Sequence, residues 1–180
     1  MSTDGYVIRL AEPGDIAVLP LVEKQAVCLF QKWLAETGLT PALLEQVSTV
    51  EEFEEARQRG HLWIALSPDA EVVGFALVII LDRLAHLDEL DVVPEHGRKG
   101  VGSKLLEIVC RWARVAGYSK VTLSTFRHVP WNAPFYESKG FRAVDPEHLG
   151  PQHVELVAAE RARGLRTDLR VIMEYGAKAG

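Results

Sequence analysis

The stretch Asp91-Val92-Val93-Pro94-Glu95-His96-Gly97-Arg98-Lys99-Gly100-Val101-Gly102-Ser103 decides the fold of this chain. An apolar, strand-like run ends at Pro94, and a glycine-rich turn follows it. A helix then begins at about Val101, because apolar residues recur at i, i+3, i+4 and i+7 as on one helix face. Gly117 follows this run where a left-handed helix cap is expected. The sequence therefore predicts a strand, a tight turn and a long amphipathic helix in succession.

The glycine-rich turn is a predicted phosphate site. Backbone N–H groups in the first turn of a helix lack acceptors inside the helix, and the helix dipole adds positive charge there. Glycine has no Cβ, so an anion can approach the backbone closely. The expected contacts are Gly97, Arg98, Lys99, Gly100, Val101, Gly102 and Ser103. The spacing fits neither the Rossmann nor the Walker pattern, so the glycines alone suit an ordinary strand-to-helix turn equally well.

Two motifs together carry more information than the glycines. Residues 94–102 resemble motif A of the GNAT superfamily of acyl-CoA N-acyltransferases, Arg/Gln-x-x-Gly-x-Gly/Ala at the start of a long helix. The segment Pro134-Phe135-Tyr136-Glu137-Ser138-Lys139-Gly140-Phe141 is similar to motif B, Phe/Leu-Tyr-x-x-x-Gly-Phe. A helix and a strand-like run at 120–124 separate them, as the family requires. The resemblance covers residues 84–144 and departs from the family at Gly97, where Arg or Gln is usual.

The resemblance implies an α/β (α+β) GNAT fold. Its central sheet is mixed but mostly antiparallel, has about six or seven strands flanked by helices, and is splayed between strands 4 and 5. Sequence patterns elsewhere predict strands at 6–10, 61–66, 72–81, 84–93, 120–124, 140–144 and 167–175. They predict helices at 16–33, 41–47, 49–59, 101–116, 132–139 and 152–163. Ser48-Thr49-Val50-Glu51 is interpreted as a capping box.

Composition indicates one globular domain over residues 1–180, because 48% of the residues are hydrophobic and 25% are charged. A net charge of −5 argues against a nucleic-acid partner. The longest apolar run, 72–81, is too short to cross a bilayer, and the polar N-terminus does not read as a signal peptide. Cys28 and Cys110 are interpreted as small buried hydrophobes in a reducing compartment, so we expect a cytoplasmic protein. A homodimer is possible.

A change of phase in the strand 84–93 predicts a β-bulge. Leu87 points to one face by strict alternation, whereas Leu90 and Val92 fall on the other. A bulge around Asp88-Glu89 would explain the slip and would leave backbone groups unpaired. The resemblance implies that the backbone of Leu90, Asp91 and Val92 binds the pantetheine arm and the thioester of acetyl-CoA.

Acetyl transfer to an amine needs a base, because an aliphatic amine has a pKa of about 10.4. Glu89, at the inferred bulge, is our first candidate and His86 our second, while a water relay is a further possibility. The resemblance implies that Tyr136 protonates the thiolate of coenzyme A, although a tyrosine there could simply pack its helix on the sheet. No metal is expected.

The residues near the second motif leave alternatives open. An Asn that the family often carries seven residues before the Tyr is Val129 here, and Asn132 is a candidate for a cofactor contact or, more readily, for a helix N-cap. His128 and Trp131 could line the acceptor pocket or lie in an exposed loop.

The expected function is therefore transfer of an acetyl group from acetyl-CoA to a primary amine of a small molecule, peptide or protein. A non-catalytic acyl-CoA-binding or sensor domain is the alternative, and a nucleotide-phosphate site is disfavoured because no Walker lysine follows the turn. The sequence identifies neither the amine nor the range of acyl groups.

Overall fold

The computed structural model describes residues 5–176 of the 180-residue chain. They form one seven-stranded sheet in the order β1-β2-β3-β4-β5-β7-β6. The strands are β1 (Val7–Leu10), β2 (Leu62–Leu66), β3 (Val72–Leu81), β4 (Leu84–Val92), β5 (Lys120–Phe126), β6 (Arg142–Ala143) and β7 (Arg170–Gly176). Only β4 and β5 pair in parallel; every other neighbouring pair is antiparallel. The predicted mixed, mostly antiparallel sheet is confirmed.

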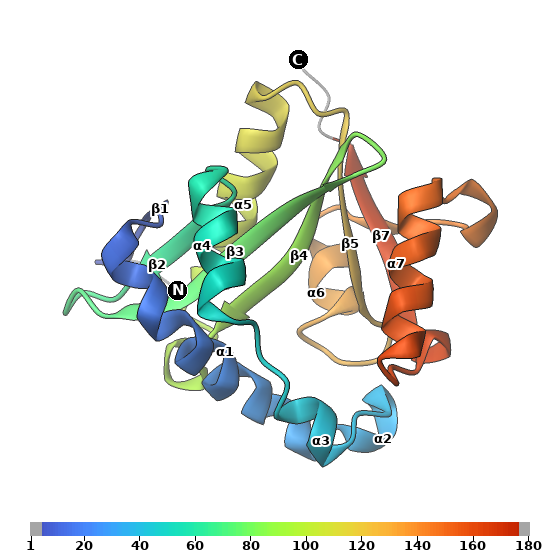
Figure 1. Cartoon of the computed structure of the whole chain (residues 1–180), viewed down its shortest axis with the longest axis horizontal. Helices are drawn as coiled ribbons and strands as arrows, with labels where there is room; N and C mark the ends of the chain where they lie inside the picture. Colours follow the sequence, from blue (N-terminus) through green and yellow to red (C-terminus); the bar gives the residue numbers. More distant parts are fainter. Residues whose placement is uncertain (1–4, 177–180) are drawn as a thin grey trace.

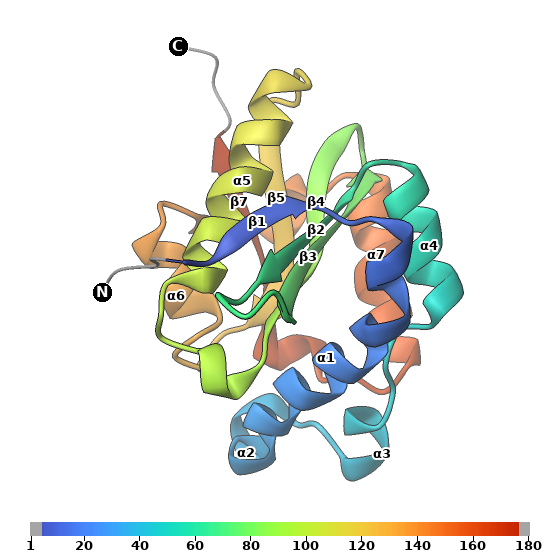
Figure 2. The ribbon, with the colours of Figure 1, turned by 90° about the vertical axis from the view of Figure 1, so that its left-hand side faces the viewer.

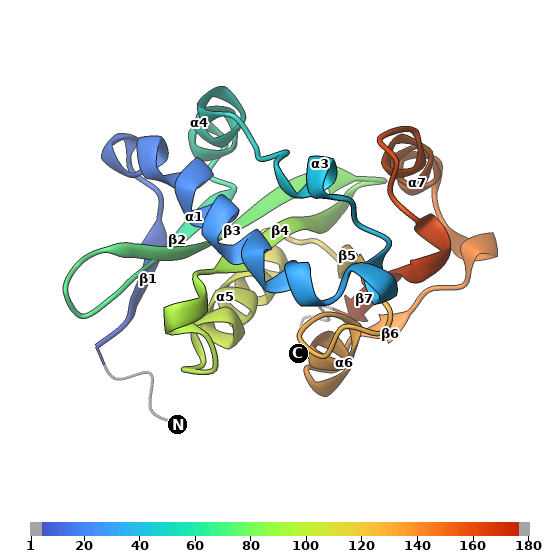
Figure 3. The same cartoon turned by 90° about the horizontal axis from the view of Figure 1, so that it is seen from below.

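Helices cover both faces of the sheet (Figure 2). The helices α1, α4 and α7 lie on one face, while α5 and α6 lie on the other, as the view from below also shows (Figure 3). The bounds are α1 (Leu19–Val27), α2 (Leu34–Thr37), α3 (Pro41–Leu44), α4 (Val50–Gln58), α5 (Val101–Val115), α6 (Ala133–Ser138) and α7 (Pro151–Ala162). Short 3₁₀ helices occupy Pro13–Val18, Cys28–Lys32, Pro94–His96, Pro146–His148 and Thr167–Leu169.

The core lies between the sheet and these helices. The apolar stripe predicted for α5 is buried: Leu105, Val109 and Ala113 have no exposed surface. On the opposite face, Phe53 of α4 packs edge-on against Phe75 of β3, with ring centroids 5.0 Å apart. The central position expected for β3 follows from its burial on both faces.

Two helix predictions near the N-terminus were wrong in detail. The expected helix at 16–33 is two 3₁₀ segments around the shorter α1, with Pro20 in its first turn. The capping box of α4 begins one residue later than predicted, at Thr49, whose hydroxyl accepts the N–H of Glu52. Ser48 is displaced from that role because its own N–H donates to the buried carboxylate of Glu23 at 2.8 Å.

The two cysteines differ in their surroundings. Cys28 is exposed, so its predicted burial was wrong; it lies in the 3₁₀ segment after α1, and its thiol contacts the carbonyl of Lys24 at 3.4 Å. Cys110 is half-buried in α5, where burial raises the pKa of its thiol to about 12. Neither forms a disulfide. Within residues 5–176, no helix has the length and apolar character that a bilayer crossing requires.

The predicted bulge and splay are both present in β4. In the β3–β4 register Leu77 faces Glu89 and Val78 faces Leu87, so Asp88 is the extra residue. The parallel pairing with β5 extends only over Ala85 to Leu87, opposite Val121 to Leu123. Beyond this point β4 and β5 diverge, as Figure 1 shows. The divergence leaves one edge of β4 unpaired by β5 from Asp88 onward.

Candidate active site

The bulge at Asp88 changes the face of the sheet toward which the side chains of β4 point. Leu87, before the bulge, is 2% exposed in the core, and Leu90, after it, packs against the same core. The two residues between them, Asp88 and Glu89, both line a cavity on the opposite face. An extra residue in one strand allows two consecutive side chains to share a face, which a regular strand forbids.

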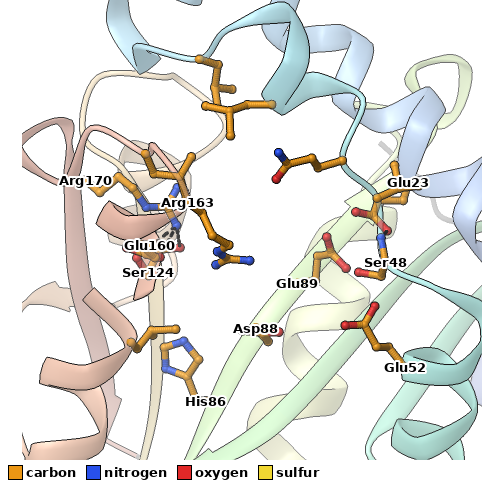
Figure 4. Close-up of a pocket in the computed structure, with 16 residues that line it drawn as sticks. Glu23, Ser48, Glu52, His86, Asp88, Glu89, Ser124, Glu160, Arg163 and Arg170 are labelled. Atoms are coloured by element: carbon orange, nitrogen blue, oxygen red, sulfur yellow. Dashed lines mark hydrogen bonds and ion pairs between the residues drawn. The ribbon is translucent and has the colours of Figure 1, made fainter. Parts of the chain in front are cut away.

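The cavity has a volume of about 360 Å³, and the residues that line it come from α1, α3 and α4 on one side and from α7 and β7 on the other. Figure 4 shows Glu23, Glu52, Asp88 and Glu89 on one wall and Glu160, Arg163, Ser124 and Arg170 on the other. The Arg170 guanidinium is paired with the Glu160 carboxylate at 2.9 Å. The remaining charges make the cavity acidic on balance.

Glu89 has a strongly perturbed carboxyl group. Burial is the main cause and raises its pKa well above the ordinary glutamate value; the charges of Asp91 and Glu23 act in the same direction. The Glu23 and Glu89 carboxyls also lie within hydrogen-bonding reach. A carboxyl with a raised pKa is a stronger base than an exposed glutamate and can hold a proton taken from a bound group.

Tyr136 lies on α6, within the motif at residues 134–141, and is 7% exposed. Its ring packs between Phe135 and Phe141, at centroid distances of 5.1 and 5.7 Å. Burial and the nearby charge of Asp91 raise the pKa of the phenol, so the group is protonated at neutral pH. Burial, with the charge of Glu23, also raises the pKa of Asp91 to about 8.

The glycine-rich turn joins β4 to α5 on the other face of the sheet. Arg98 and Gly100 have positive φ angles of 59° and 83°, and Gly100 is the residue before the first helical turn. The N–H of Gly97 donates to the Pro94 carbonyl at 3.0 Å, whereas those of Val101, Gly102 and Ser103 open α5, where no intrahelical acceptor exists. A helix N-terminus therefore adjoins the unpaired edge of β4.

Comparison with known proteins identifies the family to which this chain belongs. The model of the acetyltransferase (GNAT) family matches residues 29–141, which include both the β4–α5 turn and α6. The chain belongs to the GNAT acetyltransferase family. It is 27% identical over 145 residues to an uncharacterized N-acetyltransferase, YafP, of Escherichia coli strain K12, covering 79% of this chain and 85% of the relative.

Solved structures share the fold. PaiA N-acetyltransferase from Thermoplasma acidophilum, in complex with coenzyme A, superposes with a TM-score of 0.68 at 20% identity, over 95% of this chain and 98% of that one. N-acetylglutamate synthase from Neisseria gonorrhoeae, complexed with coenzyme A and N-acetyl-glutamate, gives a TM-score of 0.70 at 18% identity. That match covers 97% of this chain but 35% of the synthase, so the chain spans about a third of that relative.

In this acetyltransferase two other predicted site residues, His86 and Asn132, lie in separate parts of the fold. His86 lines the same cavity as Glu89 and is 1% exposed. Asn132 has the N-cap position of α6, but its side chain makes no capping hydrogen bond, so the predicted capping contact was wrong. Its Oδ1 is instead buried without a partner among the described residues. Such an orphaned acceptor can be satisfied by an ordered water or by a donor of a bound molecule.

His128 and Trp131 do not line the cavity. Trp131 packs against Phe30 and Trp33 from the N-terminal segment, at centroid distances of 5.8 and 5.4 Å. This aromatic contact joins the β5–α6 loop to the 3₁₀ segment after α1.

Sequence reasoning missed Glu23, which is 4% exposed and faces Glu89. The available signal was a carboxylate next to Val22 on the apolar face of α1. It also missed Asp82, Thr122 and His153, which hydrogen-bond in a row behind His86. Within residues 5–176, no group of three or more His, Cys, Asp or Glu side chains is arranged to hold a metal ion.

Proposed function

We propose that this enzyme transfers an acetyl group from acetyl-CoA to a primary amine, with Glu89 as the base that deprotonates the amine and Tyr136 as the acid that protonates the departing thiolate. The observation that carries the proposal is the bulge at Asp88. It places Glu89 in the acidic cavity, and the pairing of β4 with β5 ends next to it, so the proposed base and a backbone edge that β5 does not pair lie on the same segment of β4.

Acetyl-CoA supplies the thioester, and several features of this chain suit it. The backbone of Leu90, Asp91 and Val92 lies beyond the pairing with β5 and can hydrogen-bond the pantetheine arm. The first turn of α5 can bind the pyrophosphate, with Arg98 and Lys99 beside it. The unpartnered Oδ1 of Asn132, at the start of α6, is a further acceptor. The proposed contacts in the turn are Gly97, Arg98, Lys99, Gly100, Val101, Gly102 and Ser103.

The acceptor is a primary amine of a small molecule, peptide or protein. At neutral pH such a group arrives as an ammonium ion, because its pKa is about 10.4. Glu23, Glu52 and Asp88 line the cavity with carboxyl groups; burial raises the pKa of Glu23 and of Asp88, and a bound cation favours the ionised form of each. The raised pKa of Glu89 suits removal of the first proton from the ammonium ion. The balance of charge in the cavity therefore favours a cationic acceptor over an anionic one.

Tyr136 is suited to the opposite task. Its phenol keeps its proton because burial raises its pKa, and its hydroxyl has no hydrogen-bond partner among residues 5–176. A protonated, unpaired phenol can donate to a thiolate that forms beside it. We further propose a cytoplasmic location, supported by the exposed thiol of Cys28 and the free thiol of Cys110.

Binding is tested by thermal unfolding with and without acetyl-CoA, with ATP and NAD as controls. A ligand at about 100 times its Kd stabilises by roughly 2.7 kcal/mol, which corresponds to a Tm increase of about 5–10 °C for a chain of this size. Stabilisation by ATP or NAD but not by acetyl-CoA would contradict the proposed site.

Turnover is tested by thiol release with a panel of a polyamine, an amino acid and a peptide with a free N-terminus. We expect Tyr136→Phe and Glu89→Gln to lower kcat by about 10²–10⁴-fold without loss of acetyl-CoA binding. Tyr175→Phe is the matched control, because its ring packs on Phe141 at 5.3 Å on the other side of the same cluster. Binding without turnover by the wild type would favour the sensor alternative.

A further inference from the structure

Four side chains form a buried row of hydrogen bonds between the cavity and the start of α7. His86 Nδ1 lies 2.9 Å from Thr122 Oγ1, and Thr122 Oγ1 lies 2.9 Å from His153 Nε2. His153 Nδ1 lies 2.6 Å from Asp82 Oδ2. His86, Thr122 and His153 are 1–3% exposed, whereas Asp82 lies in the turn between β3 and β4 with 14% of its side chain exposed. The row therefore leads from the cavity toward the protein surface.

The row fixes the direction of each hydrogen bond. An ionised Asp82 only accepts, so His153 Nδ1 carries the proton between them. Burial opposes ionisation of Asp82, but hydrogen bonds from the N–H of Gln152 and from His153 outweigh it and lower the pKa of the carboxyl. When His153 is neutral, its Nε2 accepts the Thr122 hydroxyl proton, and Thr122 Oγ1 then accepts from His86 Nδ1–H. His86 is left with a lone pair on Nε2.

The His86 ring, which carries this lone pair, lines the cavity. The His86 ring points from β4 into the cavity in Figure 4, and its Nδ1 is already bonded to Thr122. Nε2 has no hydrogen-bond partner within residues 5–176. Asp88 and Glu89 line the same cavity two and three positions further along β4 than His86. A bound amine that reaches Glu89 therefore enters a cavity whose wall includes the His86 ring.

The reaction requires two protons to leave the acceptor nitrogen. An ammonium ion loses one before it can attack the thioester, and the nitrogen loses a second once its bond to the acetyl carbon has formed. Glu89 accounts for the first proton in the function proposed above. The thiolate of coenzyme A receives one proton from Tyr136. Glu89 gives up its proton and Tyr136 regains one before the next turnover, so one proton in total is released to solvent.

We propose that His86, Thr122, His153 and Asp82 form a proton relay that removes the second proton from the acceptor nitrogen; this inference rests on the proposed acetyl transfer. The nitrogen's proton bonds to His86 Nε2 as the N–H bond breaks. The Nδ1 proton of His86 passes to Thr122 Oγ1, and the Thr122 hydroxyl proton passes to His153 Nε2. His153 becomes an imidazolium paired with the Asp82 carboxylate, and it returns the proton to solvent beside Asp82.

The electrostatics of His86 agree with this geometry. Burial, with the positive charges of His153 in its protonated form and of Arg170, lowers the pKa of His86 to about 3. A histidine in this environment does not retain a second proton, so a proton that arrives at Nε2 requires Nδ1 to give its own away. The row supplies an acceptor at 2.9 Å for that purpose. His86 is the catalytic member, and the other three are positioning residues.

The tautomer of His86 is measurable without any activity. Nitrogen-15 NMR of the imidazole rings is expected to show His86 protonated at Nδ1 and unprotonated at Nε2 at neutral pH. In Asp82→Asn the amide can donate to His153 Nδ1, which reverses every hydrogen bond of the row and places the proton of His86 on Nε2. A wild-type His86 already protonated at Nε2 overturns the relay.

The kinetic test uses variants of Thr122. Thr122→Val removes the hydroxyl with little change of shape, and we expect kcat/KM to fall about 10–100-fold, as for other partners that fix an imidazole. Thr122→Ser keeps a hydroxyl and is expected to recover most of that loss. A kcat/KM for Thr122→Val within twofold of Thr122→Ser overturns the relay.

A control separates the relay from the cap of α7. Asp82 also accepts the N–H groups of Gln152 and His153, and its own N–H donates to the Gln152 side chain. Gln152→Ala loosens this turn but leaves the His153 ring in place, so we expect neither the tautomer nor kcat/KM to change. Equal losses in Gln152→Ala and Asp82→Asn, with no reversal of the tautomer, would overturn the relay in favour of a structural role.

The same assays distinguish the relay from the function on which it rests. Loss of turnover in Glu89→Gln with no loss in Thr122→Val would retain the acetyl transfer and overturn the relay. A wild type that acetylates no amine in the panel would overturn the proposed function and the catalytic role of His86 with it, whereas the NMR spectrum would still decide the tautomer.

Discussion

Replacing Asp91 by Asn should change how the stability of the protein depends on pH. The pKa of Asp91 is about 8 in the folded chain, against 3.8 for an ordinary aspartate, because of burial and the charge of Glu23. The folded state therefore binds more protons than the unfolded state between about pH 4 and pH 8. The contribution of this group to the free energy of unfolding is present in full below pH 4 and is lost as pH rises toward 8.

The size of the effect follows from the number of protons released. Within this interval, one group with a raised pKa lowers the free energy of unfolding by at most about 1.4 kcal/mol for each unit that pH rises. Asp91 keeps some solvent contact, so we expect the wild type to lose about 2 kcal/mol between pH 6 and pH 8 through this group. For a chain of this length that loss lowers Tm by about 4–8 °C. Asp91→Asn abolishes this pH-dependent loss of stability, since an amide does not ionise.

The assay is thermal unfolding of both proteins from pH 5 to pH 9. The Tm of Asp91→Asn minus that of the wild type should increase with pH, because only the wild type must ionise the Asp91 carboxyl, whose pKa is raised in the folded state. Asp69→Asn, in the exposed turn between β2 and β3, is the matched control and should give a constant difference. A constant difference for Asp91→Asn as well would refute the reasoning, because it would mean that the Asp91 carboxyl ionises as readily folded as unfolded.

Three further predictions follow from particular contacts. Glu23→Gln removes a carboxylate that raises the pKa of Glu89, so the acidic limb of the kcat/KM profile should move to lower pH; a shift to higher pH would contradict the assignment of Glu89 as base. In Gly74→Ala the new Cβ would lie 2.5 Å from the Asp91 carbonyl oxygen, so we expect a loss of about 1–3 kcal/mol in chemical denaturation, and an unchanged midpoint would show that β4 can shift freely. Thr49→Ala removes the cap of α4 and should lower stability by about 1 kcal/mol while kcat/KM stays the same; a fall in kcat/KM of the folded variant would contradict a purely structural role for this cap.

Local sequence signals predicted much of the fold because they act over short distances. The apolar spacing after Val101 predicted α5, and the phase slip between Leu87 and Leu90 predicted the bulge that the β3–β4 register confirms at Asp88. Both depend on the period of a single element. The one-residue error at Thr49 arose because the competing partner of Ser48, the Glu23 carboxylate, comes from another helix.

By itself, the sequence determined the family, the order of strands and helices, and the position of the turn and the tyrosine helix, because these depend on residues close together in the chain. Only the tertiary structure decided the proton chemistry. The carboxyl of Glu23 meets Glu89 across 66 positions, and Asp82, Thr122 and His153 align behind His86 from three separate elements. Burial and neighbouring charge set the pKa of each group, and both are properties of the packed protein that no single segment contains.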